Sequence, residues 1–318
     1  MENKIGMESE TKKTAGGEKP FRVEFAECWR AMPDKGLFLA LLAAWLGLFH
    51  WLGNSAAGYT RTTSLFGWML HVYSNSVDDE HGQLVPFVVL GLLWWKRGEL
   101  LAVNKEVWWP ALGFVVAGLG LHWFGFAIHQ ARVSIAGFFL GLYGLTGLVW
   151  GRGWLRASFF PFFLFVFCVP LATVSEAVTS PLRILATWLT VGVARVAGVD
   201  VIRSGSQIYD AGRTFMYDVA PACSGIRSII SLVAVTTIYG FMQFRQPWRR
   251  GVMIAAALPL ALAGNVARLT TVILTAEVFG QEAGAWVEQK LGLVTFVASV
   301  GCVVLLGRWL REKQEEAI

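Results

Sequence analysis

The segment Ala220-Pro221-Ala222-Cys223-Ser224-Gly225-Ile226-Arg227 joins a polar stretch, residues 199–219, to a long apolar stretch, residues 226–244. Its Ala-Pro and Ser-Gly pairs are typical of a turn that opens a helix. Cys223 would then lie at a helix N-terminus, where unpaired N–H groups and the helix dipole favour the thiolate. Arg227, one turn further on, would favour the thiolate again. The alternative is a small buried cysteine at a helix start, with Arg227 as an interfacial anchor.

The composition is that of a membrane protein. Of the 318 residues, 55% are hydrophobic and only 15% are charged, against about 25% charged in soluble domains. Several apolar runs reach the roughly 18 residues that a helix needs to cross a bilayer. We therefore predict an all-α, polytopic transmembrane bundle that contacts the lipid bilayer. The net charge of +5 does not indicate a nucleic-acid partner, because Lys and Arg lie in short loops between the apolar runs.

The apolar runs predict about eight spans. These are residues 37–53, 84–95, 108–127, 133–150, 159–171, 226–244, 252–276 and 291–306. Residues 54–83 read as a polar connection. Residues 175–199 have an apolar face but carry one Glu and two Arg, so we expect a helix at the membrane interface or half-buried in the bundle. Residues 199–219 contain Ser-Gly-Ser and Ala-Gly turns and predict a small hairpin outside the bilayer.

Charge predicts the domain limits and the topology. Residues 1–34 would form a disordered cytoplasmic tail with an amphipathic helix over about 21–32. Residues 35–308 would form the membrane domain and residues 309–318 a second cytoplasmic tail. The basic residues gather in the tails and in alternate loops, which the positive-inside rule places in the cytoplasm. The hairpin and Cys223 would then face the other side of the membrane.

A second polar group, residues 264–268, lies inside the seventh predicted span. Arg268 is about 16 residues, or about 24 Å, from the cytoplasmic start of that span, so it should lie near the depth of Cys223. An arginine inside the membrane indicates a functional site. The alternative is an arginine that snorkels to the outer interface. Asn265 shares the helix face of Arg268, and Glu288, just before the eighth span, would reach the same depth.

These residues carry a resemblance to the exosortase/archaeosortase family of polytopic membrane cysteine transpeptidases. Residues 222–227 (Ala-Cys-Ser-Gly-Ile-Arg) resemble the nucleophile motif A-C-S-G-x-R of that family, and residues 264–268 resemble its N-x-x-R motif. Residues 81–86 (His-Gly-Gln-Leu-Val-Pro) resemble its H-G-x-L-[IV]-P element, and residues 160–171 its Pro-bounded apolar segment. The resemblance covers about residues 70–300.

The resemblance implies that Cys223 is the nucleophile and Arg268 its partner cation. It implies supporting or substrate-binding roles for Arg227, Asn265, Ser224 and His81. The family carries a third catalytic residue after the N-x-x-R helix, usually His, or Arg in archaeosortases. This sequence has Glu288 at that place, four residues before Gly292, and no His after His129. Three alternatives stay open: Glu288 takes part, an upstream His such as His81 substitutes, or the chain is a divergent, weakened member.

The resemblance also implies a reaction. The substrates would be secreted proteins with a C-terminal signal made of a short motif such as Pro-Glu-Pro, an apolar helix and a basic tail. Cys223 would attack a backbone carbonyl and form a thioester, Arg268 would stabilise the thiolate or the oxyanion, and an amine or water would resolve the thioester. No cofactor or metal is implied. The location would be the bacterial inner membrane, with the active site on the extracytoplasmic face.

Two rival functions share parts of this pattern. A transporter or channel would also place an arginine inside a helix, but it gives no reason for a cysteine at a helix mouth beside an external hairpin. A catalytically weakened member that acts as a binding or assembly protein in export or polysaccharide production is the more serious rival, because the family His is missing.

Overall fold

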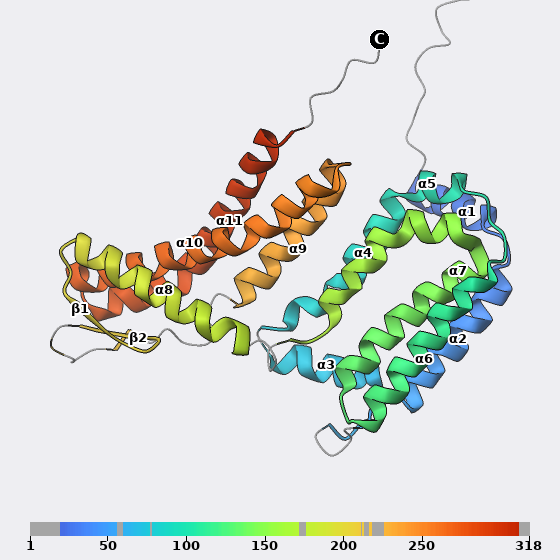
Figure 1. Ribbon diagram of the computed structural model, residues 1–318, viewed down its shortest axis with the longest axis horizontal. Helices are drawn as coiled ribbons and strands as arrows, with labels where there is room; N and C mark the ends of the chain where they lie inside the picture. Colours follow the sequence, from blue (N-terminus) through green and yellow to red (C-terminus); the bar gives the residue numbers. More distant parts are fainter. Residues whose placement is uncertain are drawn as a thin grey trace, which may run out of the picture.

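The helices of the chain form two groups, one on each side of residues 172–175 (Figure 1). The computed structural model describes residues 20–55, 60–76, 78–171, 176–210, 212, 216–217 and 226–311. The first group contains α1 (Phe21–Ala31), α2 (Lys35–Trp51), α3 (Leu65–Asn75), α4 (Val85–Trp95), α5 (Arg97–Ala102), α6 (Leu112–Ala127) and α7 (Ala131–Phe163), with the short 3-10 turns η1 (Glu80–Gln83), η2 (Trp109–Ala111) and η3 (Leu164–Cys168). The second group contains α8 (Glu176–Val196), β1 (Val201–Ser204), β2 (Gln207–Asp210), β3 (Met216–Tyr217), α9 (Ile226–Gln243), α10 (Pro247–Phe279) and α11 (Gln281–Trp309).

The predicted all-α membrane architecture is confirmed, but the predicted count of about eight spans is not. Among the described residues, four helices are long and apolar enough to cross a membrane: Trp109–Ala127, Ala131–Cys168, Pro247–Phe279 and Gln281–Trp309. A fifth span would need α1 and α2 to act together, although they are bent by 96° from one another. Helix α4 has only 11 residues, or about 16 Å, roughly half of the hydrocarbon thickness. The apolar runs therefore overstate the number of membrane-length helices.

The predicted fourth and fifth spans are the two halves of the bent helix α7. Gly151 inside α7 has a φ of 88°, a conformation that glycine adopts without steric cost. The Tyr143 hydroxyl donates to the carbonyl of Leu155 at 2.7 Å, whereas twelve residues of straight helix would separate the two by about 18 Å. The chain therefore turns back at Gly151, and the two halves of α7 lie beside one another (Figure 1).

Glycines let α6 and the first half of α7 pack backbone to backbone. A Cβ on Gly118 would lie 2.6 Å from the carbonyl oxygen of Gly137 and 2.8 Å from the nitrogen of Gly141. Small residues are typical of helix contacts inside membranes, where close packing replaces the hydrophobic driving force. The indole of Trp45 on α2 closes this core by donating to the carbonyl of Phe138 at 3.1 Å.

The connection at residues 54–83 is predicted to be polar, yet it contains helix α3. Ser64 caps this helix by accepting the Gly67 N–H at 3.2 Å. Leu65, Met69 and Tyr73, spaced four apart, are buried in the core of the first group. Helix α3 is itself mostly apolar, so the polar character predicted for residues 54–83 belongs to the residues on either side of it.

Two buried or half-buried polar side chains fix the end of the first group. The carboxylate of Asp79, which is 3% exposed, accepts the backbone N–H of Leu171 at 2.9 Å. Arg132 donates to the carbonyl of Pro170 at 2.8 Å. The segment that leads toward α8 is therefore held by both the α3–α4 connection and α7.

The second group contains a helix and a hairpin where the sequence predicts them. Helix α8 is not among the membrane-length apolar helices, and its buried face packs on α10. Strands β1, β2 and β3 form one antiparallel sheet in that order, with Val201 opposite Asp210 and Ser204 opposite Gln207. Of the two predicted tails, residues 1–34 and 309–318, the parts 1–19 and 312–318 lie outside the described residues, and α1 lies where the tail helix over about 21–32 is expected.

Candidate active site

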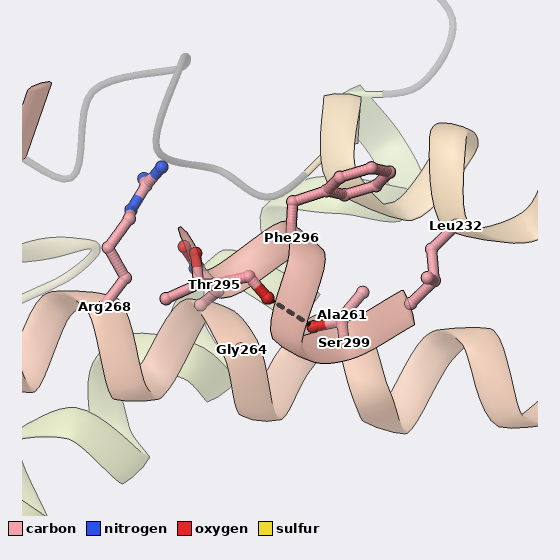
Figure 2. Close-up of a pocket in the computed structure, with 8 residues that line it drawn as sticks. Leu232, Ala261, Gly264, Arg268, Thr295, Phe296 and Ser299 are labelled. Carbon is pink, nitrogen blue, oxygen red and sulfur yellow. Dashed lines mark hydrogen bonds between the residues drawn. The ribbon is translucent and has the colours of Figure 1, made fainter. Parts of the chain in front are cut away.

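Arg268 lies two-thirds of the way along α10, with its side chain pointing away from that helix (Figure 2). Its Nε and Nη2 atoms are buried and make no hydrogen bond with any described residue. A Cβ built on Gly292 of α11 would lie 3.6 Å from Nη1, so the guanidinium approaches α11 where that helix has no side chain. A buried cation whose donors are uncommitted is unusual, because buried charges are normally paired.

A small pocket extends from Arg268 between three helices of the second group (Figure 2). Its lining comes from Leu232 of α9, from Ala261, Gly264, Asn265 and Arg268 of α10, and from Thr295, Phe296 and Ser299 of α11. Its volume of about 10 Å³ is about the room that one water molecule needs. A substrate peptide could therefore not enter it, and any large substrate would have to meet Arg268 from the open side.

The pocket requires the glycine of the N-x-x-R segment. A Cβ on Gly264 would lie 2.8 Å from the Oγ of Ser299, whose hydroxyl donates to the Thr295 carbonyl at 2.9 Å. A larger residue at position 264 would therefore displace the Ser299 hydroxyl from its place between α10 and α11. Thr295 and Ser299 were not singled out from the sequence, although two hydroxyl residues spaced four apart in an apolar helix are the signal that could have found them.

Asn265 lies on the same face as Arg268, as its spacing predicts. It is 8% exposed and also lines a second small pocket with Leu182 and Ala186 of α8. Its side-chain amide makes no hydrogen bond with any described residue. Asn265 therefore lies at the junction of α8, α9 and α10, next to the guanidinium but not bonded to it.

Glu288 lies within α11, not before a span as the sequence suggested, because α11 begins at Gln281. It is half-buried and four residues before Gly292, so it lies one turn from the point where Arg268 approaches α11. No ion pair joins Glu288 to Arg268. The structure thus brings the two residues to the same region of two neighbouring helices without the bidentate contact that would orient the arginine.

The other predicted site residues are only partly placed. Cys223 and Ser224 lie outside the described residues, shortly before α9 begins at Ile226. Arg227 belongs to the first turn of α9, but its side chain lies outside the described part of the structure. Because α9 also contributes Leu232 to the pocket, the helix that follows Cys223 is the one that packs beside Arg268.

His81 is not brought to Arg268. It lies in η1, in the first group, where its Nδ1 is 3.0 Å from the carbonyl oxygen of Asp78. Its neighbour Gly82 is buried against Tyr73, and a Cβ at position 82 would lie 2.5 Å from that ring. Within the described residues, the H-G-x-L-x-P element therefore forms a packed turn between α3 and α4, and no hydrogen bond or ion pair links His81 to the arginine.

Comparison with known proteins gives one match. The family model of the transmembrane exosortases matches residues 73–305, which include Cys223, Arg268 and Glu288. Searches of curated proteins and of solved structures found no match. The matched range covers most of the chain and begins in α3, so it takes in every element described around Arg268. The chain therefore belongs to the transmembrane exosortase family.

Proposed function

We propose that the protein is a membrane cysteine transpeptidase or protease that cleaves the C-terminal sorting signals of secreted proteins through a thioester on Cys223. Transmembrane exosortases are a cysteine transpeptidase family, so membership supports this kind of activity. We further propose that the protein acts in the bacterial inner membrane, with its active site on the extracytoplasmic face.

The uncommitted guanidinium of Arg268 is the observation that carries the proposal. Two of its nitrogens are buried without a partner among the described residues, beside a small pocket that is lined in part by α9, the helix that follows Cys223. Preorganised donors in a water-poor site stabilise developing negative charge strongly, because they need not reorganise during the reaction. Donors already tied to a carboxylate would not be available for that role.

Cys223 and Arg268 carry the bond-making step in this proposal. The Cys223 thiolate attacks the carbonyl carbon of the scissile peptide bond, and Arg268 donates to the oxyanion that forms. The C–N bond then breaks, the leaving amine takes a proton from water, and the acyl group remains on sulfur as a thioester. An amine or water attacks this thioester and gives up a proton to water, the C–S bond breaks, and the thiolate is restored.

The proposal is tested by co-expression with a secreted protein that carries a short motif, an apolar helix and a basic tail at its C-terminus. We expect trimming of the signal with the wild type and none with Cys223→Ala or Cys223→Ser, because only a thiolate is activated in such a setting. Cys302→Ala is the matched control, because Cys302 is an exposed cysteine on a different element, α11. Continued trimming by Cys223→Ala would exclude the thioester mechanism.

A binding or assembly protein is the second candidate, favoured by one observation: no His follows His129, although the family usually carries its third catalytic residue as a His. This candidate predicts that the protein retains its partners when Cys223 is replaced, and that an impermeant thiol reagent on intact cells finds no fast-reacting cysteine. A transpeptidase should show one such cysteine, which disappears in Cys223→Ser.

A further inference from the structure

A large groove lies between α8 and strand β1, away from the small pocket at Arg268. Its volume is about 630 Å³, within the range of ligand sites in proteins. Most of the lining is apolar: Trp188, Leu189, Val191, Val193, Val196 and Ile202. Arg195 and Arg203 add two positive charges. Trp188 is 61% exposed, so a large aromatic side chain stands uncovered beside these cations.

Strand β1 is an edge strand, because the sheet order is β1-β2-β3. The hairpin closes through Gly205 and Ser206, and Gly205 has a φ of 61°, as in a two-residue type II′ turn. In such a hairpin the closing pair, Ser204 and Gln207, exchanges hydrogen bonds, and the pattern alternates along the strand. The backbone groups of Val201 and Arg203 must therefore point outward, away from β2.

One contact independently supports this orientation. Arg195 of α8 donates from Nε and Nη2 to the carbonyl of Val201, at 3.3 and 3.0 Å. That carbonyl can be reached from α8 only if it points out of the sheet on the side of the groove. The N–H and carbonyl of Arg203, two residues on, point to the same side and have no backbone partner among the described residues.

The side chain of Arg203 is equally uncommitted. It is exposed and makes no hydrogen bond or ion pair with a described residue. An open strand edge offers a template for one more strand, and the side-chain contacts beside it then select the sequence. Here those contacts are a cation and an aromatic ring.

We propose that this groove binds an extended peptide, which adds to β1 as a further strand and places an acidic side chain on Arg203 and an apolar one on Trp188. The peptide is the segment of the secreted substrate next to its membrane helix. This inference rests on the proposed function, since it names where that substrate is held.

The groove lies close enough to Arg268 for one extended peptide to reach both. Helix α10 supports the hairpin directly, because Leu269, Ile273 and Ala276 pack with Val201 and Ile208 of the two strands. Ala276 follows Arg268 by eight residues, or about 12 Å of helix. Four residues of extended chain cover about the same distance. A peptide held at β1 could therefore run toward the guanidinium without leaving the second group of helices.

The test measures association without turnover. The Cys223→Ala protein is labelled and reconstituted in nanodiscs with a synthetic probe: an octapeptide rich in Val and Thr with one Glu, followed by a polyleucine helix of about 20 residues. Energy transfer reports binding. We expect Arg203→Gln to weaken association about tenfold, the effect of losing one charge-assisted hydrogen bond. Arg152→Gln is the matched control, because Arg152 is another exposed arginine without a partner among the described residues.

Backbone methylation distinguishes strand addition from side-chain contact. N-methyl groups on every second residue of the probe should abolish binding in one register and leave it unchanged in the other, since alternate N–H groups face β1. Equal effects in both registers, or equal effects of Arg203→Gln and Arg152→Gln, would overturn the proposal.

Further outcomes distinguish a peptide site from a lipid site, and the groove proposal from the proposed catalytic function. If Arg203→Gln changes the retention of anionic phospholipid but not of the probe, the groove is a lipid site and the peptide proposal is wrong. If the probe binds as expected but co-expressed substrates are never trimmed, the groove stands and the proposed catalytic function fails. If Arg203→Gln changes neither trimming nor probe binding, the groove proposal is wrong and the proposed catalytic function still stands.

Discussion

At the scale of single residues, Arg268 differs from a structural arginine in its contacts with the described part of the chain. A structural arginine inside a membrane is normally paired with a carboxylate or with backbone carbonyls. Arg268 instead has Nε and Nη2 buried without a hydrogen-bond partner among the described residues, and Nη1 approaches Gly292. Its planar fork can present two donors to one oxyanion, which the single point charge of a lysine cannot.

We therefore expect Arg268→Lys to reduce the single-turnover rate of substrate trimming by about 100-fold or more, the scale of losing an oxyanion donor. Folded yield and melting temperature should change little, since no hydrogen bond to a described residue is lost. Arg152→Lys, at an exposed position, serves as the control. A lysine variant that keeps more than half of the rate would show that charge alone suffices.

Glu288 poses a sharper question now that it is not paired with Arg268. A carboxylate cannot stabilise a thiolate directly, because like charges repel. It could still orient the arginine during turnover or accept a proton from the attacking amine. We expect Glu288→Gln to keep part of the trimming rate, Glu288→Ala to lose more, and Glu288→His to keep or raise it by restoring the family residue. Wild-type rates in all three variants would make Glu288 a bystander.

At the scale of elements, the close contact of α6 with α7 depends on glycine at particular turns. A Cβ on Gly118 meets backbone atoms of α7, which cannot rotate away as a side chain could. Gly120, two residues on in the same helix, has nothing within 4 Å of the corresponding position.

Gly118→Ala should therefore destabilise the protein by about 1–3 kcal/mol through overpacking. Gly120→Ala should be neutral or slightly stabilising, because alanine is the better helix former. Thermal unfolding of the two purified variants in the same detergent measures the difference. Equal melting temperatures would mean that α6 and α7 are not in contact through Gly118.

At the scale of the whole molecule, the ends of the elements are sorted by charge. The α4–α5 junction, the bend of α7, the α9–α10 turn and the end of α11 lie toward one side of the molecule, shown at the top of Figure 1. These are the places where the sequence carries its clusters of Lys and Arg. Helix α3, the α6–α7 turn and the hairpin lie toward the opposite side (Figure 1).

Topology reporters test this sorting directly. Fusions after Gly53 and near Gly205 should report the extracytoplasmic side, and fusions after Arg97, Arg250 and Arg311 should report the cytoplasm. The expectation follows from the basic residues at the second set of positions. A cytoplasmic signal at Gly205 would place the β1 groove and the proposed active site on the wrong face for a sorting enzyme.

The sequence by itself determined the class of the protein. Apolar composition is a property of each segment alone, so the helical membrane fold could be predicted, and a helix and a hairpin lie where the sequence placed them, at α8 and at β1 and β2. The shared helix face of Asn265 and Arg268 could also be predicted from the sequence, since residues three apart lie on the same face of any helix.

Only the tertiary structure decided how these segments combine. The two apolar runs of α7 lie beside one another because the chain turns back at Gly151 and the Tyr143 hydroxyl contacts the Leu155 carbonyl. Likewise, Glu288 and His81 are equally eligible in the sequence, but only Glu288 lies near Arg268, because α11 packs on α10 whereas η1 packs in the other group. Such contacts join residues far apart in the chain, and local patterns carry no information about them.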